Sequence, residues 1–315
     1  RPPRSTQSRS SAASDVYKRQ PIPRGYYGDM ISRTSAIPGI TVLMPNKDIR
    51  GENYDTYFSF RMSKIPTVLA TAASTQVTST GTHVGTAQLG EDPLPWLYQY
   101  PGILQPTPSL AVSAEGKGVV TSSPELDGVT RRVPLVVNSQ GKLYPSFGLE
   151  LLRVAIGDPS YQLKTGTQGI EWIRVPNYPL MNTDANGRIW LNWNTKFYKQ
   201  TASAFINDPI HAPFVIFGTT AEGVTNPVPT PAGAKYPHEI QANILHNLIQ
   251  GTAPSSPTWA SAAEYGIGLL ALIILALATR SVWLSIPSLV LVVGGSSYGA
   301  WYAFQSSYLI DASGI

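Results

Sequence analysis

The hydrophobic pattern of the chain changes at about residue 260. Before it, apolar residues form short runs separated by turn residues; after it come two almost uncharged apolar runs, 261–280 and 282–304. Each reaches the roughly 20 residues that a helix needs to cross hydrocarbon. Tryptophan and tyrosine lie toward the run ends, as in the aromatic belts of membrane proteins. The pattern predicts a transmembrane helical hairpin; its alternative is a very apolar helix pair in a soluble core.

The connection between these runs contains Arg280. By the positive-inside tendency this connection is cytoplasmic, which would place the preceding polar region outside the cytoplasm. Residues 305–315 would then begin an extracytoplasmic loop. We expect the sequence to be truncated at both ends, with a third crossing beyond Ile315.

In residues 21–250, apolar residues recur at the spacings of strands and helices, which is typical of a folded domain. Residues 37–74 are predicted as strand, helix and strand, with Asn53 as N-cap and Pro66 preventing continuation of the helix. Residues 75–115, rich in Thr, Gly, Pro and Ser, show no sustained period and are predicted as loop with one short element. A Pro/Ser/Ala linker is expected at 251–260.

Two β-branched runs follow, separated by turn residues at Asp127-Gly128 and at 138–141. The next segment predicts a helix with Pro145 at its first position and Gly157 after its end. Its predicted buried face comprises Phe147, Leu151, Val154 and Ala155.

Residues 169–194 are predicted as a hairpin about the turn 184–187. The apolar run at 214–217 is typical of a buried strand leading into a glycine loop, and residues 238–251 predict an amphipathic helix. Alternation of strands with helices favours the α/β class: a layered sheet with flanking helices and β-hairpins, followed by the transmembrane hairpin.

The net charge of +4 comes from the first twenty residues, which hold five basic side chains and one acidic. The rest of the chain is balanced and has no basic stripe, which argues against nucleic-acid binding. Residues 1–20 are predicted to be disordered, and 14–20 (SDVYKRQ) resemble a translated sequencing adapter, so we expect an artefact there. The absence of cysteine excludes disulfides and thiolate metal sites.

Two segments could bind a ligand. Arg131 and Arg132 beside Asp127 could form an anion pocket, because guanidinium groups match carboxylates; the alternative is an ion pair that stabilises a turn. The backbone of Gly218-Thr219-Thr220 could bind an anion at a strand end, or form a tight turn.

Catalytic and metal motifs are missing from the sequence. His83, His211, His238 and His246 are too scattered for a metal set, so no cofactor or metal is expected. Glu150 is predicted to be a solvated residue on its helix.

Several motifs in order resemble the second type of CHASE domain, the extracellular sensory domain associated with cyclases and histidine kinases. They are Asp127-Gly128, Arg131-Arg132, Pro134-Leu135 and Tyr144-Pro145-Ser146, then 217–231 and 238–251, with Asp55 resembling a helix-opening aspartate. The resemblance covers about residues 36–250. It implies a periplasmic sensory domain of a multi-pass inner-membrane bacterial receptor, with an output module, most often an adenylate or guanylate cyclase, outside this sequence.

The leading hypothesis is therefore the sensory half of a signalling receptor that responds to a small molecule or to an envelope ligand. The resemblance implies a homodimer as its working form. Two alternatives stay open: a membrane-anchored extracytoplasmic enzyme using Asp127, Arg131, Asp184 and Glu222, and a structural envelope anchor.

Overall fold

The computed structural model describes most of the chain after residue 53 and divides it into two compact units. The described residues are 54–78, 84–122, 124–193, 195–209, 212–221, 224–255, 259–278, 282–305 and 307–309. One unit is Arg1–Glu52 with Phe197–Asn226, and the other is Asn53–Lys196 with Pro227–Ile315. The first predicted strand, at 40–45, and the predicted cap Asn53 lie outside the described residues, as does Arg280.

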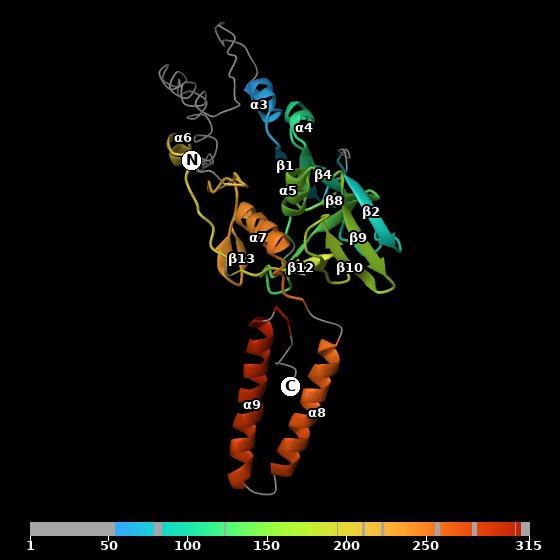
Figure 1. The fold of residues 1–315 in the computed structure, drawn as a ribbon, viewed down its shortest axis with the longest axis vertical. Helices are drawn as coiled ribbons and strands as arrows, with labels where there is room; N and C mark the ends of the chain where they lie inside the picture. Colours follow the sequence, from blue (N-terminus) through green and yellow to red (C-terminus); the bar gives the residue numbers. More distant parts are fainter. Residues whose placement is uncertain are drawn as a thin grey trace, which may run out of the picture. The chain divides into compact units, whose positions relative to one another are not determined.

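The larger unit is built around helix α5 (Phe147–Ile156), which packs against strand β5 (Gly116–Val119) and against helix α7 (Pro237–Gln250) (Figure 1). Glycines allow this close packing. A Cβ at Gly116 would lie 2.4 Å from Glu150 Oε1, and one at Gly118 would lie 2.3 Å from Phe147 Cα. On the opposite side, a Cβ at Gly148 would lie 2.8 Å from Ile244 Cγ2.

Burial of α5 on two sides corrects its predicted apolar face. Ala155 is exposed, whereas Leu149 and Leu152 are fully buried. The helix begins two residues later than predicted, because Pro145 ends strand β8 (Lys142–Pro145) and Ser146 is the N-cap, its side chain accepting from the Leu149 N–H. Gly157 ends the helix at φ 70°, as predicted.

The strands form several small sheets. The first has the order β4-β1-β5, with β1 (Val68–Ser74) parallel to β5 and antiparallel to β4 (Gly102–Leu104). The second has the order β3-β7-β8, in which β3 (Gln99–Tyr100) is parallel to β7 (Val136–Ser139) and β7 forms a hairpin with β8. Turn residues Gln140 and Gly141 in that hairpin both have positive φ.

The largest sheet has the order β11-β10-β9-β2. Strand β2 (Gly85–Gly90) is parallel to β9 (Ser160–Gly166), which is antiparallel to β10 (Gly169–Arg174), and β10 pairs with the short β11 (Met181–Asn182). The prediction of loop across 75–115 is therefore wrong, because β2, β3, β4 and helix α4 (Pro108–Ser113) lie there. These strands are short or lie at sheet edges, so polar and apolar side chains occur in them without the alternation that predicts a strand.

Two further two-stranded sheets complete the larger unit. Strand β12 (Arg188–Trp190) pairs with β6 (Arg132–Pro134), and β13 (Val228–Thr230) pairs with β14 (Gly233–Lys235). The hairpin predicted about 184–187 is corrected by this pairing. The turn exists, but the strands on its two sides join different sheets.

The fold is thus mixed α/β with several small sheets, in place of the single layered sheet that was predicted. The apolar run 214–217 is also corrected: it forms no strand, and Phe217 is 71% exposed. A buried strand needs ladder partners for its backbone, and none of the described strands pairs with this run. The smaller unit, to which it belongs, contains helix α6 (Ala202–Asn207), and Phe205 contacts Phe217 edge-to-face there.

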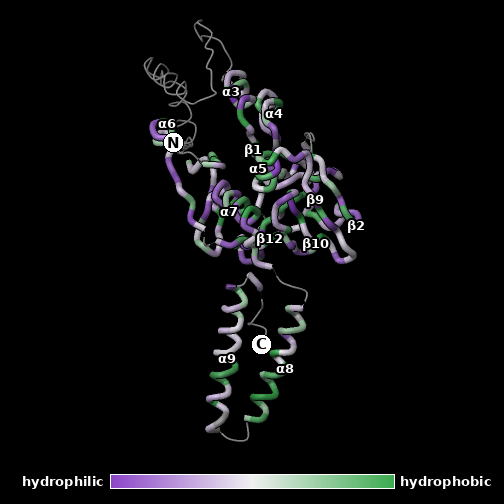
Figure 2. The backbone as a smooth tube through the Cα atoms, viewed as in Figure 1, coloured by the Kyte–Doolittle hydropathy of each residue, from purple (hydrophilic) through white to green (hydrophobic). Residues whose placement is uncertain are grey.

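Helices α8 (Ala260–Ala278) and α9 (Val282–Gln305) lie side by side, and helix α3 (Tyr54–Met62) packs on α4 near the start of the larger unit. In both α8 and α9 the half nearer their connection is the more apolar (Figure 2). By length and hydropathy together, none of the helices in the described part of the chain qualifies as a membrane span.

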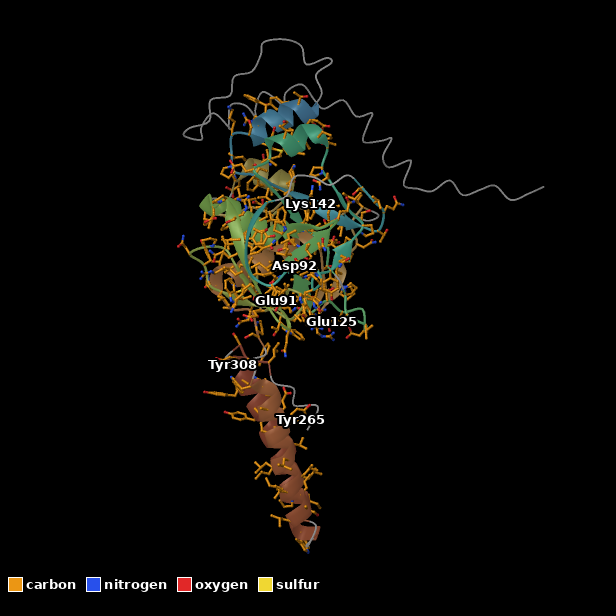
Figure 3. All side chains as sticks on the ribbon, turned by 90° about the vertical axis from the view of Figure 1, so that its right-hand side faces the viewer. Glu91, Asp92, Glu125, Lys142, Tyr265 and Tyr308 are labelled. Carbon is orange, nitrogen blue, oxygen red and sulfur yellow. The ribbon has the colours of Figure 1, made fainter. Side chains whose placement is uncertain are left out.

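The two ends of this hairpin are tied together by main-chain hydrogen bonds. The Ser255 N–H donates to Ser307 O at 3.0 Å, and the Leu309 N–H donates to Ser255 O at 3.0 Å. Trp259 contacts Tyr308 edge-to-face, with ring centroids 5.9 Å apart. Tyr265 and Tyr308 lie toward the same end of the hairpin (Figure 3). The segment before α8 and the segment after α9 are therefore in direct contact.

Candidate functional site

The predicted residues Asp127, Arg131 and Arg132 lie in one ionic cluster. Arg131 contacts Asp127 at 2.7 Å and Glu125 at 3.1 Å, while Arg132 contacts Glu125 at 2.8 Å. The cluster extends to Asp184, whose Oδ2 accepts from Arg132 at 3.3 Å and from Arg188 at 2.7 Å. We call these six residues the arginine cluster: Glu125, Asp127, Arg131, Arg132, Asp184 and Arg188.

Two turns and one strand pair position the arginine cluster. The Gly128 N–H donates to Glu125 O, and the Asp127 carboxylate accepts from the Val129 N–H, so this turn presents both acids on one side. In the second turn, Asp184 Oδ1 accepts from the N–H groups of Asn186 and Arg188. Pairing of β6 with β12 then brings the two turns together.

Aromatic rings lie against two of the guanidinium groups. Arg132 lies 5.0 Å from the ring centroid of Trp190, and Arg188 lies 5.6 Å from that of Tyr98. Such contacts restrict the orientation of the planar guanidinium groups.

The ionic contacts change the acidity of the cluster. The hydrogen bond from Arg131 lowers the pKa of Asp127 to about 2. Burial alone would raise the pKa of Glu125, but hydrogen bonds from Arg132 and Arg131 outweigh it and lower that pKa. The hydrogen bond to Asp127 raises the pKa of Arg131. Asp127, Glu125 and Arg131 are therefore charged at neutral pH.

With three acids facing three arginines, the cluster neutralises its own charge. This geometry favours the turn-stabilising ion pair that was the alternative to an anion pocket; the pocket stays a prediction. Sequence reasoning missed Glu125 and Arg188, and it grouped Asp184 with Asp127 and Arg131 only in the alternative enzyme hypothesis, not as an ion-pair partner of Arg132. The signal that could have found Arg188 is its place directly after a turn, four residues from Asp184.

Glu150 corrects a prediction, since it is fully buried instead of solvated. Its carboxylate accepts from Arg153 Nε and Nη2, both at 2.8 Å, and the side chain of Arg153 is only 10% exposed. Burial raises the pKa of Glu150, which the contact with Arg153 opposes, and the hydrogen bond to Glu150 raises the pKa of Arg153. The sequence pattern did not predict this buried pair, because α5 is covered by β5 on one side and by α7 on another, so that more than its apolar stripe is buried.

A family model for the CHASE2 domain matches residues 6–279, which is most of the chain. The chain belongs to the CHASE2 domain family. CHASE2 domains are extracytoplasmic sensory domains of signalling receptors, and they are not catalytic. The resemblance carried by residues 127–146, 217–231 and 238–251 is thereby confirmed. No curated protein and no solved structure matches the chain.

The second predicted segment of this CHASE2 domain, Gly218-Thr219-Thr220, belongs to the smaller unit, whereas the arginine cluster belongs to the larger one. The side chain of Thr219 accepts from the Ala221 N–H at 3.3 Å, a local turn contact. Because the expected strand before it is absent, the segment does not lie at a strand end. Anion binding there stays a prediction.

The residues of the alternative enzyme hypothesis do not form a separate constellation. Asp127, Arg131 and Asp184 of the CHASE2 domain are engaged within the arginine cluster, and Glu222 lies outside the described residues. Among the described residues, no group of three His, Cys, Asp or Glu could hold a metal ion. His238 stacks on Tyr236 with centroids 5.9 Å apart, while His83 and His211 lie outside the described residues.

Proposed function

We propose that this chain is the sensory and membrane part of a bacterial transmembrane receptor, which passes an extracytoplasmic stimulus to a cytoplasmic output module. The observation that carries the proposal is its membership of the CHASE2 family over residues 6–279. We expect a small molecule or an envelope component as the stimulus and a homodimer as the working form. An adenylate or guanylate cyclase is the output module that we propose.

We propose also that α8 and α9 cross the inner membrane as a hairpin. At 1.5 Å per residue, helices of 19 and 24 residues extend about 28 and 36 Å, close to the roughly 30 Å of hydrocarbon. Glu264 is the one charged residue in these two helices.

The exposure of their side chains supports this. Leu269, Leu270 and Leu272 in α8 are 62%, 58% and 67% exposed, and Val290 and Leu291 in α9 are 67% and 65% exposed. Consecutive residues of a helix lie about 100° apart, so these exposed leucines and valines cover a broad part of each helix surface. Such surfaces are unfavourable in water and favourable in lipid.

Alkaline carbonate extraction tests the membrane proposal. Membranes from bacteria that express the chain are washed at high pH, which releases peripheral proteins but leaves spanning proteins in the pellet. We expect the chain in the pellet; its release as a soluble species would contradict the hairpin and, with it, the transmembrane receptor.

The output module is tested separately by sequencing the native gene beyond Ile315. We expect a third apolar span followed by a cyclase or a kinase module. A reading frame that continues into a secreted enzyme or stops at once would count against this part of the proposal and leave the family assignment intact.

A further inference from the structure

A cleft of about 630 Å³ opens beside the buried Glu150–Arg153 pair. None of its lining residues belongs to the arginine cluster. Arg153, Glu115 and Lys117 line it from α5 and from the start of β5, and residues of α4 form an apolar wall. The volume lies within the range of about 300–1,000 Å³ that is usual for small-molecule sites.

Arg153 is fixed in place before any ligand arrives. Its Nε and Nη2 donate to the carboxylate of Glu150, and its Nη1 donates to the carbonyl oxygen of Asp158. The side chain is only 10% exposed, so it is held on several sides. These contacts occupy three of the five guanidinium N–H donors. Two donors remain on a side chain that lines the cleft, without a protein acceptor among the described residues.

The opposite wall is apolar. Pro108, Ala111 and Val112 of α4 line the cleft, and Val112 is 87% exposed. Glu115, directly before β5, and Lys117 of β5 contribute one charge of each sign, and the carboxylates of Glu115 and Asp158 both interact with the charge of Arg153. A ligand that suits these surfaces has one anionic group for the guanidinium and a short apolar body for α4. The two donors that remain, one on Nη1 and one on Nη2, suit the two oxygens of a carboxylate.

We propose that this cleft binds a small organic carboxylate, with the carboxylate group on Arg153 and the apolar body along α4. This inference rests on the proposed sensory function, for which it supplies a stimulus. Arg153 lies on α5, whose Gly148 packs against Ile244 of α7, and α7 ends at Gln250, ten residues before α8 begins at Ala260. A ligand that shifts α5 therefore acts on the helix that leads to the hairpin.

The test uses the full chain, purified in detergent micelles, with three probes: acetate, hexanoate and phenylacetate. Binding is measured by isothermal titration calorimetry, and phenylacetamide serves as the uncharged control. We expect saturable binding that tightens from acetate to the two larger acids, with at least tenfold weaker binding of the amide. Arg153 itself is not substituted, because its loss would leave Glu150 buried without a partner.

Val112 provides variants that leave the core unchanged, since its side chain is exposed. Val112→Glu places a negative charge beside the carboxylate and should weaken phenylacetate binding at least tenfold. Val112→Gln, of matched size, should change it less than threefold. Failure of all three acids to bind by 10 mM, equal binding of the amide, or equal effects of the two variants would overturn the proposal. Carbonate extraction is independent of these results, so a failure here leaves the receptor assignment standing.

Discussion

The pair formed by Glu150 and Arg153 is the most tightly enclosed charge pair among the described residues. Both side chains come from one turn of α5, and the carboxylate has no exposed surface. A Cβ at Gly116 would collide with Glu150, so the glycine and the acid depend on each other. In water this pair would contribute little, but in this setting each charge depends on its partner.

Replacing Glu150 with glutamine should therefore be costly. The free energy of unfolding should fall by about 3 kcal/mol, because the guanidinium of Arg153 stays largely buried after its counter-charge is removed. Urea denaturation followed by tryptophan fluorescence measures the change. The matched control is Glu171→Gln, which breaks an exposed pair with Lys164 and should cost less than about 1 kcal/mol. Equal effects of the two variants would contradict this account.

The ion pairs of the arginine cluster should make the stability of the fold depend on pH in the acid range. The pKa of Asp127 is about 2 in the folded chain, against an ordinary value of 3.8. A carboxyl group with a lowered pKa stabilises the fold above its ordinary pKa, and this contribution is lost as pH falls through the folded value. Stability should fall between about pH 4 and pH 2 more steeply in the natural sequence than in Asp127→Asn, as measured by urea denaturation across that range. Parallel pH profiles would show that Arg131 does not hold this carboxylate.

At the scale of elements, the packing of α5 depends on glycines at the surfaces it shares with β5 and α7. Helices approach closely only where side chains are small, and Gln241 Oε1 accepts from the Gly148 N–H at this interface at 3.0 Å. The buried side of α7 holds the apolar residues Ile240, Ile244, Leu245 and Leu248, as the prediction of an amphipathic helix requires. The α5–α7 pair thus joins the cleft to the segment before α8.

Gly148→Ala tests this packing. Alanine favours a helix by about 1 kcal/mol, but its Cβ would lie 2.8 Å from Ile244 Cγ2 and 3.0 Å from Gln241 O. Overpacking should dominate and lower the free energy of unfolding by about 1–2 kcal/mol. Gly268→Ala in α8 is the same change with nothing within 4 Å, so it should be neutral or slightly stabilising. A stabilised Gly148→Ala variant would mean that the two helices are less tightly packed than described.

At the scale of the whole molecule, the surroundings of α8 and α9 decide between a receptor and a soluble protein. Both helices expose large apolar side chains, and their two ends are joined through Ser255 and residues 307–309. In the proposed receptor, the hairpin would relay a shift of the segment that follows α7. Helix shifts of about 1–2 Å are typical of such transitions.

Leu272→Arg separates the two environments. In lipid, arginine in the middle of a span costs about 2.5–3.5 kcal/mol on insertion scales, so the share of chain retained after carbonate extraction should fall clearly. In water, an exposed leucine can be replaced at a cost within about 0.5 kcal/mol. Leu126→Arg, at a fully exposed position in the larger unit, is the control and should leave retention unchanged. Unchanged retention of Leu272→Arg would contradict the membrane hairpin.

Local chemistry determined much of this molecule directly from the sequence. Gly157 ends α5, Gln140-Gly141 turns the β7–β8 hairpin, and the apolar positions of α7 are buried, because each depends on residues within one or two turns. The family motifs and the positions of α8 and α9 could be predicted for the same reason. Asp127 and Arg131, four residues apart, were also predicted to be near each other.

Only the tertiary structure decided which strands pair and which charges are buried. The partners of β12 and β2 are β6 and β9, 54 and 75 residues away by first paired position, so no local pattern specifies them. The sequence around Glu150 predicts a surface residue, but packing of β5 and α7 on its helix buries it. The sequence of residues 214–217 predicts a core strand, but these residues pair with none of the described strands. Burial depends on what the rest of the chain places against a segment, and that information is distributed over the whole fold.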